Sequence, residues 1–150
     1  MCAIHKYSFA PGVSMRILIV EDDRAAAHLF AEIAHQKGFE NVDLADSAES
    51  ALELAVGAQY DLVTLDIQLP GASGLEVLSA IRNMCPHAII AVISGHLPGD
   101  IDSEVAECAD VMIAKPISNG ALGTLLENAQ LIHTAMNNIR ALEKNASKGH

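Results

Sequence analysis

The stretch DLVTLDIQLPGASGLEVL, residues 61–78, decides the fold. It opens with a compact aliphatic run that ends in Asp66, passes through Pro70, Gly71 and Gly74, and returns to apolar residues at helical spacing. The aliphatic run predicts a buried strand at 61–66, and the later spacing predicts a helix at 75–83. The stiff proline and the two glycines between them predict a tight turn.

The same strand-then-helix unit recurs on both sides of this stretch. Apolar runs predict further strands at 16–20, 41–45, 88–93 and 111–114, and helical spacing predicts helices at 25–37, 47–56, 100–107 and 118–143. The helix at 100–107 has the weakest apolar pattern of these. Alternating strands and helices require parallel strands with right-handed crossovers. We therefore expect an α/β fold: a doubly wound, five-stranded parallel sheet of the flavodoxin-like kind with an extended C-terminal helix.

Composition bounds the class of protein. The chain has 150 residues, a length typical of one domain, and a net charge of −10, which repels nucleic acid and anionic membranes. No apolar run approaches the roughly 18 residues of a membrane span. The cysteines form no CxxC pair, which favours a cytoplasmic location. We expect a disordered leader at 1–14, one domain at 15–144 and a disordered tail at 145–150.

Polar residues stand where the predicted strands end. Glu21 and Asp22 follow the first strand, Asp66 the third, Ser94 the fourth and Lys115 the fifth. Because the carboxyl ends of parallel strands meet at one edge of a sheet, these side chains should converge there. Three gathered carboxylates require a hard cation, and Mg²⁺ fits because it combines one or two carboxylates with phosphate oxygens. The set predicts phosphoryl transfer onto Asp66, with charge stabilised by the metal and Lys115.

Four stretches, ILIVEDD at 17–23, residues 61–78, VISGH at 92–96 and ADVMIAKPI at 109–117, carry a resemblance to a known family. Over residues 15–126 the chain resembles the response-regulator receiver (CheY-like) family of two-component signalling. The resemblance implies that Asp66 is the phosphoacceptor and Asp22 a direct Mg²⁺ ligand. It further implies that Glu21 acts through a water molecule and that the Gln68 main-chain carbonyl is another ligand. Ser94 and Lys115 would complete the catalytic set, with a cis Lys115–Pro116 bond.

Three positions depart from the family pattern. Met112 stands where relatives have the switch aromatic, Ile117 where a Phe is common, and Cys108 where a Gly is usual. The phosphorylation set is complete, so these departures concern the surface that passes the signal on. Asp23 is better explained as a helix cap than as a ligand. The Gln68 side chain could face the phosphoryl group or the solvent, and the sequence leaves both open.

The final helix is longer than a helix that only covers its own sheet, which needs about 12 residues. Its apolar residues continue at helical spacing as Leu122, Leu125, Leu126, Ala129, Ile132, Met136, Ile139 and Leu142. Such a stripe needs a partner. We expect a homodimer through this helix or docking on another protein; the alternative is a helix folded back on its own domain.

These features together predict a single-domain response regulator. It would take its phosphoryl group from a sensor histidine kinase or phosphotransfer protein and signal by contact with a downstream protein target, with no effector domain after residue 117. It would not be an enzyme beyond its own phosphorylation and dephosphorylation. The alternative is a receiver-like interaction module that works without phosphorylation. An aspartyl-phosphate phosphatase is disfavoured, because such enzymes need a second acid where this chain has Gln68.

Overall fold

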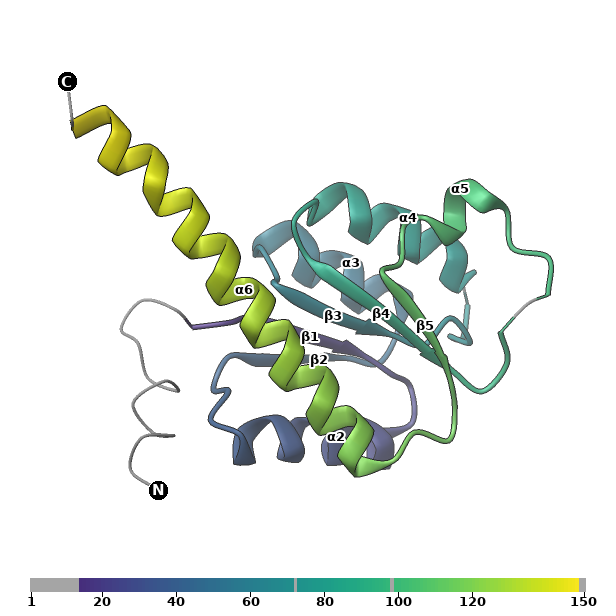
Figure 1. Cartoon of the computed structure of the whole chain (residues 1–150). Coiled ribbons are helices and arrows are strands. Elements are labelled where there is room, and N and C mark those ends of the chain that lie inside the picture. Colours follow the sequence, from purple (N-terminus) through teal and green to yellow (C-terminus); the bar gives the residue numbers. More distant parts are fainter. Residues whose placement is uncertain (1–13, 72, 98, 149–150) are drawn as a thin grey trace.

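The computed structural model describes residues 14–71, 73–97 and 99–148 (Figure 1). The strands are β1 (Ile17–Val20), β2 (Val42–Ala45), β3 (Leu62–Leu65), β4 (Ile89–Ser94) and β5 (Val111–Ala114). The helices are α2 (Arg24–Gln36), α3 (Ala48–Gly57), α4 (Gly74–Met84), α5 (Ser103–Ala106) and α6 (Asn119–Lys148). In these ranges no helix is both long and apolar enough to cross a membrane.

All five strands are parallel and lie in the order β2-β1-β3-β4-β5. Helices α2 and α6 cover one face of the sheet, and α3 and α4 cover the other (Figure 1). Side chains alternate between the faces, so Leu62 packs towards α2 and α6 whereas Val63 and Leu65 pack towards α3 and α4. The prediction of a doubly wound five-stranded sheet is confirmed.

Two helices differ from their predicted ranges by more than one residue at an end. The helix expected at 100–107 is shorter and comprises only the four residues of α5. It starts at Ser103 because the Asp102 carboxylate accepts a hydrogen bond from the Glu104 N–H at 3.0 Å and caps the helix there. Helix α6 continues to Lys148, so the backbone is still helical beyond residue 145, where the tail was expected to begin. The leader expected at 1–14 lies outside the described residues except for Ser14.

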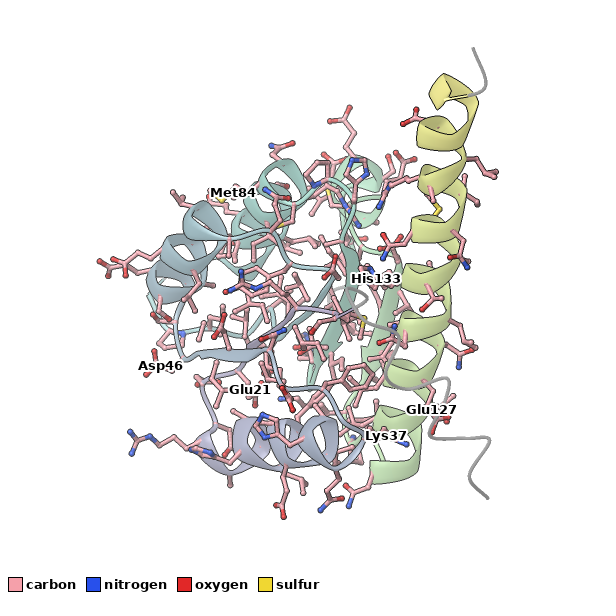
Figure 2. All side chains as sticks on the ribbon, turned by 90° about the vertical axis from the view of Figure 1, so that its left-hand side faces the viewer. Glu21, Lys37, Asp46, Met84, Glu127 and His133 are labelled. Carbon is pink, nitrogen blue, oxygen red and sulfur yellow. The ribbon has the colours of Figure 1, made fainter. Side chains whose placement is uncertain are left out.

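The first half of α6 is held against the domain. Leu122, Leu126 and Ala129 are buried against the α2 side of the sheet. Lys37 on α2 pairs with Glu127 at 2.6 Å (Figure 2), and His133 Nδ1 lies 3.4 Å from Asp61 Oδ1. Beyond this point the helix extends past the sheet (Figure 1) and its apolar side chains are exposed. The alternative prediction, in which the final helix folds back on its own domain, is therefore wrong for the second half of α6.

Arg82 braces the segment that carries Cys108. Its guanidinium donates to the carbonyls of Cys108 at 2.9 Å and Ala88 at 2.8 Å, and pairs with Asp110 at 2.9 Å. These bonds tie α4 to the residues just before β4 and β5. Met112 is half-buried against the core on the side of the sheet that α3 and α4 cover. The part of the chain that departs most from the family pattern is thus firmly connected to the domain.

Gly74, at the start of α4, allows a very close approach to the loop after β3. A Cβ atom there would lie 2.2 Å from the Cα and carbonyl oxygen of Ile67, and both of these are backbone atoms that cannot rotate away. Gly71 has a different role in the same loop, since its φ of +82° lies in the left-handed region that favours glycine.

Gly74→Ala is expected to destabilise the fold by at least about 2–3 kcal/mol, because the added methyl group forces the backbone apart. The measurement is urea unfolding followed by circular dichroism. The matched control is Gly57→Ala at the end of α3, where an added Cβ meets nothing within 4 Å. That change should be neutral or stabilising by up to about 1 kcal/mol. Equal effects of the two substitutions would contradict the close approach.

Candidate functional site

The strand ends bring the predicted polar residues together at one edge of the sheet. Glu21 and Asp22 follow β1, Asp66 follows β3, Ser94 ends β4 and Lys115 follows β5. The Glu21 and Asp66 side chains are buried, whereas Asp22 is exposed. One carboxylate oxygen from each of these three acids lies within 4.8 Å of the other two. The convergence follows directly from parallel strands that end at the same level.

The Asp66 carboxylate is fixed by donors on both oxygens. Oδ1 accepts from the Ser94 hydroxyl at 2.9 Å and from the Gln68 backbone N–H at 2.8 Å. Oδ2 accepts from Lys115 Nζ at 2.9 Å. Each donor comes from a different segment: β4, the loop after β3, and the end of β5. Asp66 is thus held in one orientation by the parts of the fold that surround it.

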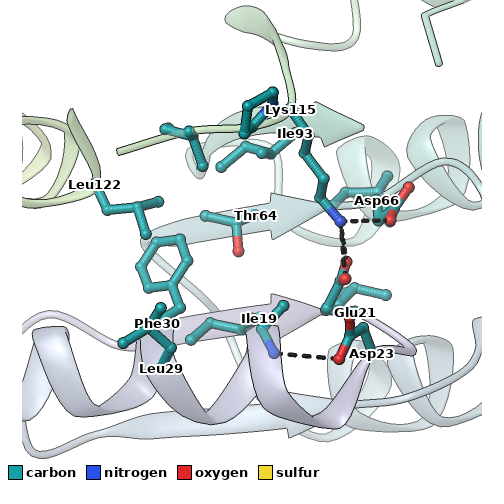
Figure 3. A pocket seen from close by; sticks show the side chains of 15 residues that line it. Ile19, Glu21, Asp23, Leu29, Phe30, Thr64, Asp66, Ile93, Lys115 and Leu122 are labelled. Atoms are coloured by element: carbon teal, nitrogen blue, oxygen red, sulfur yellow. Dashed lines mark hydrogen bonds and ion pairs between the residues drawn. The ribbon is translucent and has the colours of Figure 1, made fainter. Parts of the chain in front are cut away.

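Lys115 bridges two acids rather than one. Its Nζ lies 2.8 and 3.0 Å from the two Glu21 oxygens as well as 2.9 Å from Asp66 (Figure 3). The convergence of the strand ends predicted that Lys115 lies near these acids. It did not predict that Lys115 is shared between Asp66 and Glu21, because nothing in the spacing of residues 94 positions apart reveals a shared partner. The Lys115–Pro116 peptide bond is cis, as predicted.

These contacts set the charges of the site. Burial raises the pKa of Glu21 to about 7, although Lys115 opposes the rise. Burial would also raise the pKa of Asp66, but donation from Lys115, Gln68 and Ser94 outweighs it and holds that pKa below its ordinary value. Burial acts to lower the pKa of Lys115, and its two carboxylate partners raise it instead. Asp66 is therefore an ionised, oriented carboxylate at neutral pH, beside an ammonium group and a glutamate that can keep its proton.

The donor set fits a hard divalent cation. Glu21, Asp22 and Asp66 provide three carboxyl groups against the single ammonium of Lys115, and oxygen is the ligand atom that Mg²⁺ prefers. Asp23 is excluded from this set by its other role. Its Oδ1 accepts from the Ala25 and Ala26 backbone N–H groups at 3.0 and 3.3 Å, so it caps α2, as expected.

Two further residues lie at the rim of the site. Gln68 is exposed, and its side chain extends towards Gly95, since a Cβ atom there would lie 3.4 Å from the Gln68 Oε1. Thr64, two residues before Asp66, is a buried polar residue whose role was not predicted, because it stands inside an otherwise aliphatic run. Its spacing from Asp66 could have revealed it, because side chains two residues apart along a strand point to the same face of the sheet.

A family model described as the response regulator receiver domain matches residues 17–127, which is most of the chain. The chain belongs to the response regulator receiver domain family. Receiver domains are signalling modules of two-component systems rather than classical enzymes. The two-component response regulator ORR41 of Oryza sativa subsp. japonica is 36% identical over 123 residues, covering 78% of this chain and 95% of that protein.

Other receiver relatives are longer or structurally known. The cell cycle transcriptional regulator CtrA of Caulobacter vibrioides is 36% identical over 105 residues, and the match spans 44% of that protein's length. The response regulator TrrA of Thermotoga maritima, solved in complex with Mg²⁺-BeF, is 32% identical, with a TM-score of 0.67 over 77% of this chain and 98% of that chain. A CheY-like receiver from Methanospirillum hungatei is 25% identical, with a TM-score of 0.71 over 82% of this chain and 98% of that chain.

Proposed function

We propose that this receiver accepts a phosphoryl group on Asp66 from the phosphohistidine of a sensor histidine kinase or phosphotransfer protein. The observation that carries the proposal is the Asp66 carboxylate itself, ionised, 6% exposed and oriented by Lys115, Ser94 and the Gln68 N–H. A carboxylate fixed in this way is prepared to attack phosphorus without further reorganisation. The solved relative TrrA, which holds Mg²⁺-BeF, supports the same assignment.

In the proposed reaction an Asp66 oxygen forms a bond to phosphorus while the phosphorus–nitrogen bond of the donor breaks. The electron pair of that bond remains on the imidazole. The Lys115 ammonium group then exchanges its contact with the Asp66 carboxylate for one with a phosphoryl oxygen, and the Ser94 hydroxyl donates a hydrogen bond to another phosphoryl oxygen. Mg²⁺ would neutralise charge on the transferring group; Asp22, Asp66 and the Gln68 main-chain carbonyl would hold it, with Glu21 acting through water.

The signal would leave the domain by protein contact. Ser94 ends β4, and its hydroxyl lies 3.5 Å from the His96 carbonyl oxygen, so a movement of this hydroxyl towards the phosphoryl group would change its contact with the residues that follow the strand. With Met112 in β5, the transmission would rely on repacking of a flexible thioether rather than on a swinging aromatic ring. We assign the receiver, with its extended helix, to residues 15–144, and propose that it acts in the cytoplasm on a downstream protein target rather than on nucleic acid.

We further propose that the second half of α6 pairs with a second copy of the chain. Its apolar side chains include Leu131, Ile132, Ile139 and Leu142, exposed by 67, 52, 57 and 63%. Ile132 and Ile139 lie seven residues apart, which is the spacing of a coiled-coil seam, whereas Leu125, seven residues earlier, packs against the domain core. Residues 128–139 contain no Asp, Glu, Lys or Arg, so two copies of this acidic chain meet there without juxtaposing like charges.

The test of phosphorylation is intact-protein mass spectrometry after incubation with Mg²⁺ and acetyl phosphate, a small-molecule phosphoryl donor. The native chain is expected to gain one phosphoryl group, and the gain should vanish when Mg²⁺ is removed. Asp66→Asn, which keeps the side-chain shape but removes the charged nucleophile, should abolish the adduct entirely. The matched control is Asp46→Asn, an exposed acid on the loop before α3, which should leave it unchanged.

An adduct that persists in Asp66→Asn would place the phosphoryl group elsewhere and sink the proposal. If the native chain neither binds Mg²⁺ nor gains the adduct, the phosphorylation-independent interaction module becomes the better assignment. In that case the dimer of α6 would be the function to pursue.

A further inference from the structure

Behind the Lys115 bridge lies a pocket of about 440 Å³, between α2, the sheet and the start of α6 (Figure 3). Most of its wall is apolar. Six aliphatic or aromatic side chains form the main surface: Ile19, Leu29, Phe30, Ile93, Ile117 and Leu122. Pockets that enclose small organic ligands have volumes of roughly 300–1,000 Å³, and a cavity of about 150 Å³ already accepts benzene. The space is therefore large enough for a molecule of two fused rings.

The pocket exists because the first turn of α2 carries small side chains. Ala25, Ala26 and Ala27 follow one another there, and Ala26 lines the pocket with a single methyl group. Asp23 fixes this turn by capping the Ala25 and Ala26 N–H groups, so the helix is not free to move in and close the gap. On the other side, Pro116, Ile117 and Leu122 hold the connection from β5 to α6 as the opposite wall.

Thr64 gives the pocket a specific polar feature. The residue is 3% exposed and lies on the pocket-facing side of β3, with its hydroxyl directed towards Ile19 and Phe30 (Figure 3). No residue that the structure describes forms a hydrogen bond with this hydroxyl. Yet none of the described side-chain oxygens or nitrogens that are cut off from solvent lacks a partner. The Thr64 hydroxyl is therefore reached through the pocket, where it can pair with one polar atom of a guest.

The charged residues that line the pocket determine which ligand charge it can accept. Glu21, Asp23 and Asp66 line it with three carboxyl groups, and Lys115 is the only cation in the lining. Lys115 is already occupied by Glu21 and Asp66 at 2.8–3.0 Å. An anionic molecule would therefore meet net negative charge, while an uncharged one would not.

We propose that this pocket is a binding site for a neutral, mainly apolar small molecule that carries one hydroxyl or carbonyl group. The apolar body lies against Phe30, Ile93 and Leu122, and its polar group pairs with Thr64. The ligand would take no part in the proposed phosphorylation chemistry, although the pocket shares the Glu21, Asp66 and Lys115 side chains with that site at one end of its wall.

The experiment is methyl NMR of the full chain with isotope-labelled isoleucine and leucine, without Mg²⁺ or any phosphoryl donor. The probes are 1-naphthol, naphthalene and 1-naphthoate, which share one ring system and differ in the polar group. 1-Naphthol should shift the methyl signals of Ile19, Ile93 and Ile117, and leave Ile81 and Ile90 on the opposite face unmoved. Naphthalene should bind more weakly, and 1-naphthoate should bind weakest.

Two substitutions separate the contributions. Thr64→Val, nearly equal in volume, should weaken 1-naphthol binding by about 3- to 10-fold, the effect of one net hydrogen bond, and leave naphthalene binding unchanged. Ala26→Leu, which fills the gap from the α2 side, should weaken both by about tenfold or more. If Ala26→Leu does not give a dispersed spectrum, Thr64→Val carries the test alone.

Three results would overturn the proposal: no methyl shifts with 1-naphthol up to its solubility, equal 1-naphthol binding by native protein and Thr64→Val, or tightest binding by 1-naphthoate. Because neither metal nor phosphoryl donor is present, these results bear only on the pocket and leave the assignment of Asp66 untouched.

Discussion

Lys115→Met is expected to slow the phosphorylation of Asp66 by acetyl phosphate about 100-fold or more, because one preorganised donor to a developing negative charge commonly contributes about 10²–10³ in rate. Methionine keeps the length and much of the volume of the lysine stem and removes only the ammonium group. The rate is followed by mass spectrometry at fixed Mg²⁺ and acetyl phosphate concentrations. A rate within a few-fold of the native value would remove Lys115 from the proposed machinery.

The same substitution should also reveal what Lys115 contributes to folding. Without it, Glu21 and Asp66 face each other with no cation between them, so the pKa values of both carboxyl groups rise in the folded state. A group whose folded pKa is raised loses its stabilising contribution as pH rises through that pKa. The variant should therefore be more destabilised at pH 8 than at pH 5, by about 2 kcal/mol. This is less than the cost for a fully buried pair, because Lys115 is 29% exposed. Added Mg²⁺ should restore much of the loss at pH 8.

Lys37→Met is the matched control for both measurements. Lys37 also pairs with a glutamate, Glu127, at 2.6 Å, but at the surface between α2 and α6 and away from the strand ends. Surface pairs contribute about 0–1 kcal/mol, so its loss should be small and without the pH trend, and phosphorylation should proceed at the native rate. If the two variants behaved alike, the effect of Lys115 would be a general consequence of removing a positive charge from an acidic protein.

Replacing Ile132 and Ile139 together with glutamate is expected to convert a dimer of this chain into a monomer. Both side chains lie in the proposed seam of α6 and are more than half exposed in the single chain. Two buried, unpaired carboxylates in each copy would weaken the dimer by far more than 100-fold. Sedimentation velocity of the native chain and the variant over a range of concentrations measures the change directly.

The control for the seam is Val56→Glu on α3, where the native side chain is 76% exposed and belongs to a different surface. This variant should sediment as the native chain does. A native chain that stays monomeric at the highest concentration tested would contradict pairing through α6, and the exposed stripe would then need a partner of another kind.

The sequence predicted the edge of the sheet well because parallel topology leaves few choices. Once strands are assigned before Asp22, Asp66, Ser94 and Lys115, their ends must meet, whatever the details of packing. The limits appeared where tertiary contacts decide. The sharing of Lys115 between Glu21 and Asp66 depends on side-chain directions across 94 residues of chain separation. The short α5 depends on the position of the Asp102 cap inside a segment with no clear apolar pattern.

The pocket could not be predicted from the sequence, and the reason is related. An alanine at position 26 reads as an ordinary helix residue, and a threonine at position 64 reads as an ordinary strand residue. Only the distance between α2 and the sheet turns the pair into a wall and a hydrogen-bonding group of one cavity. Small residues thus carry information that composition and periodicity do not register, because what matters is the volume they leave empty.

Helix α6 also has a mechanical consequence. It starts four residues after Lys115 and runs as one uninterrupted element to Lys148, and its last buried residue against the sheet is Ala129. With a rise of about 1.5 Å per residue, the portion beyond the His133–Asp61 contact is a lever of about 22 Å. A tilt of about 5° where this portion leaves the domain moves the far tip by about 2 Å, enough to change how two such helices cross. Displacements too small to notice at the strand ends would thus be amplified into a different angle between paired copies.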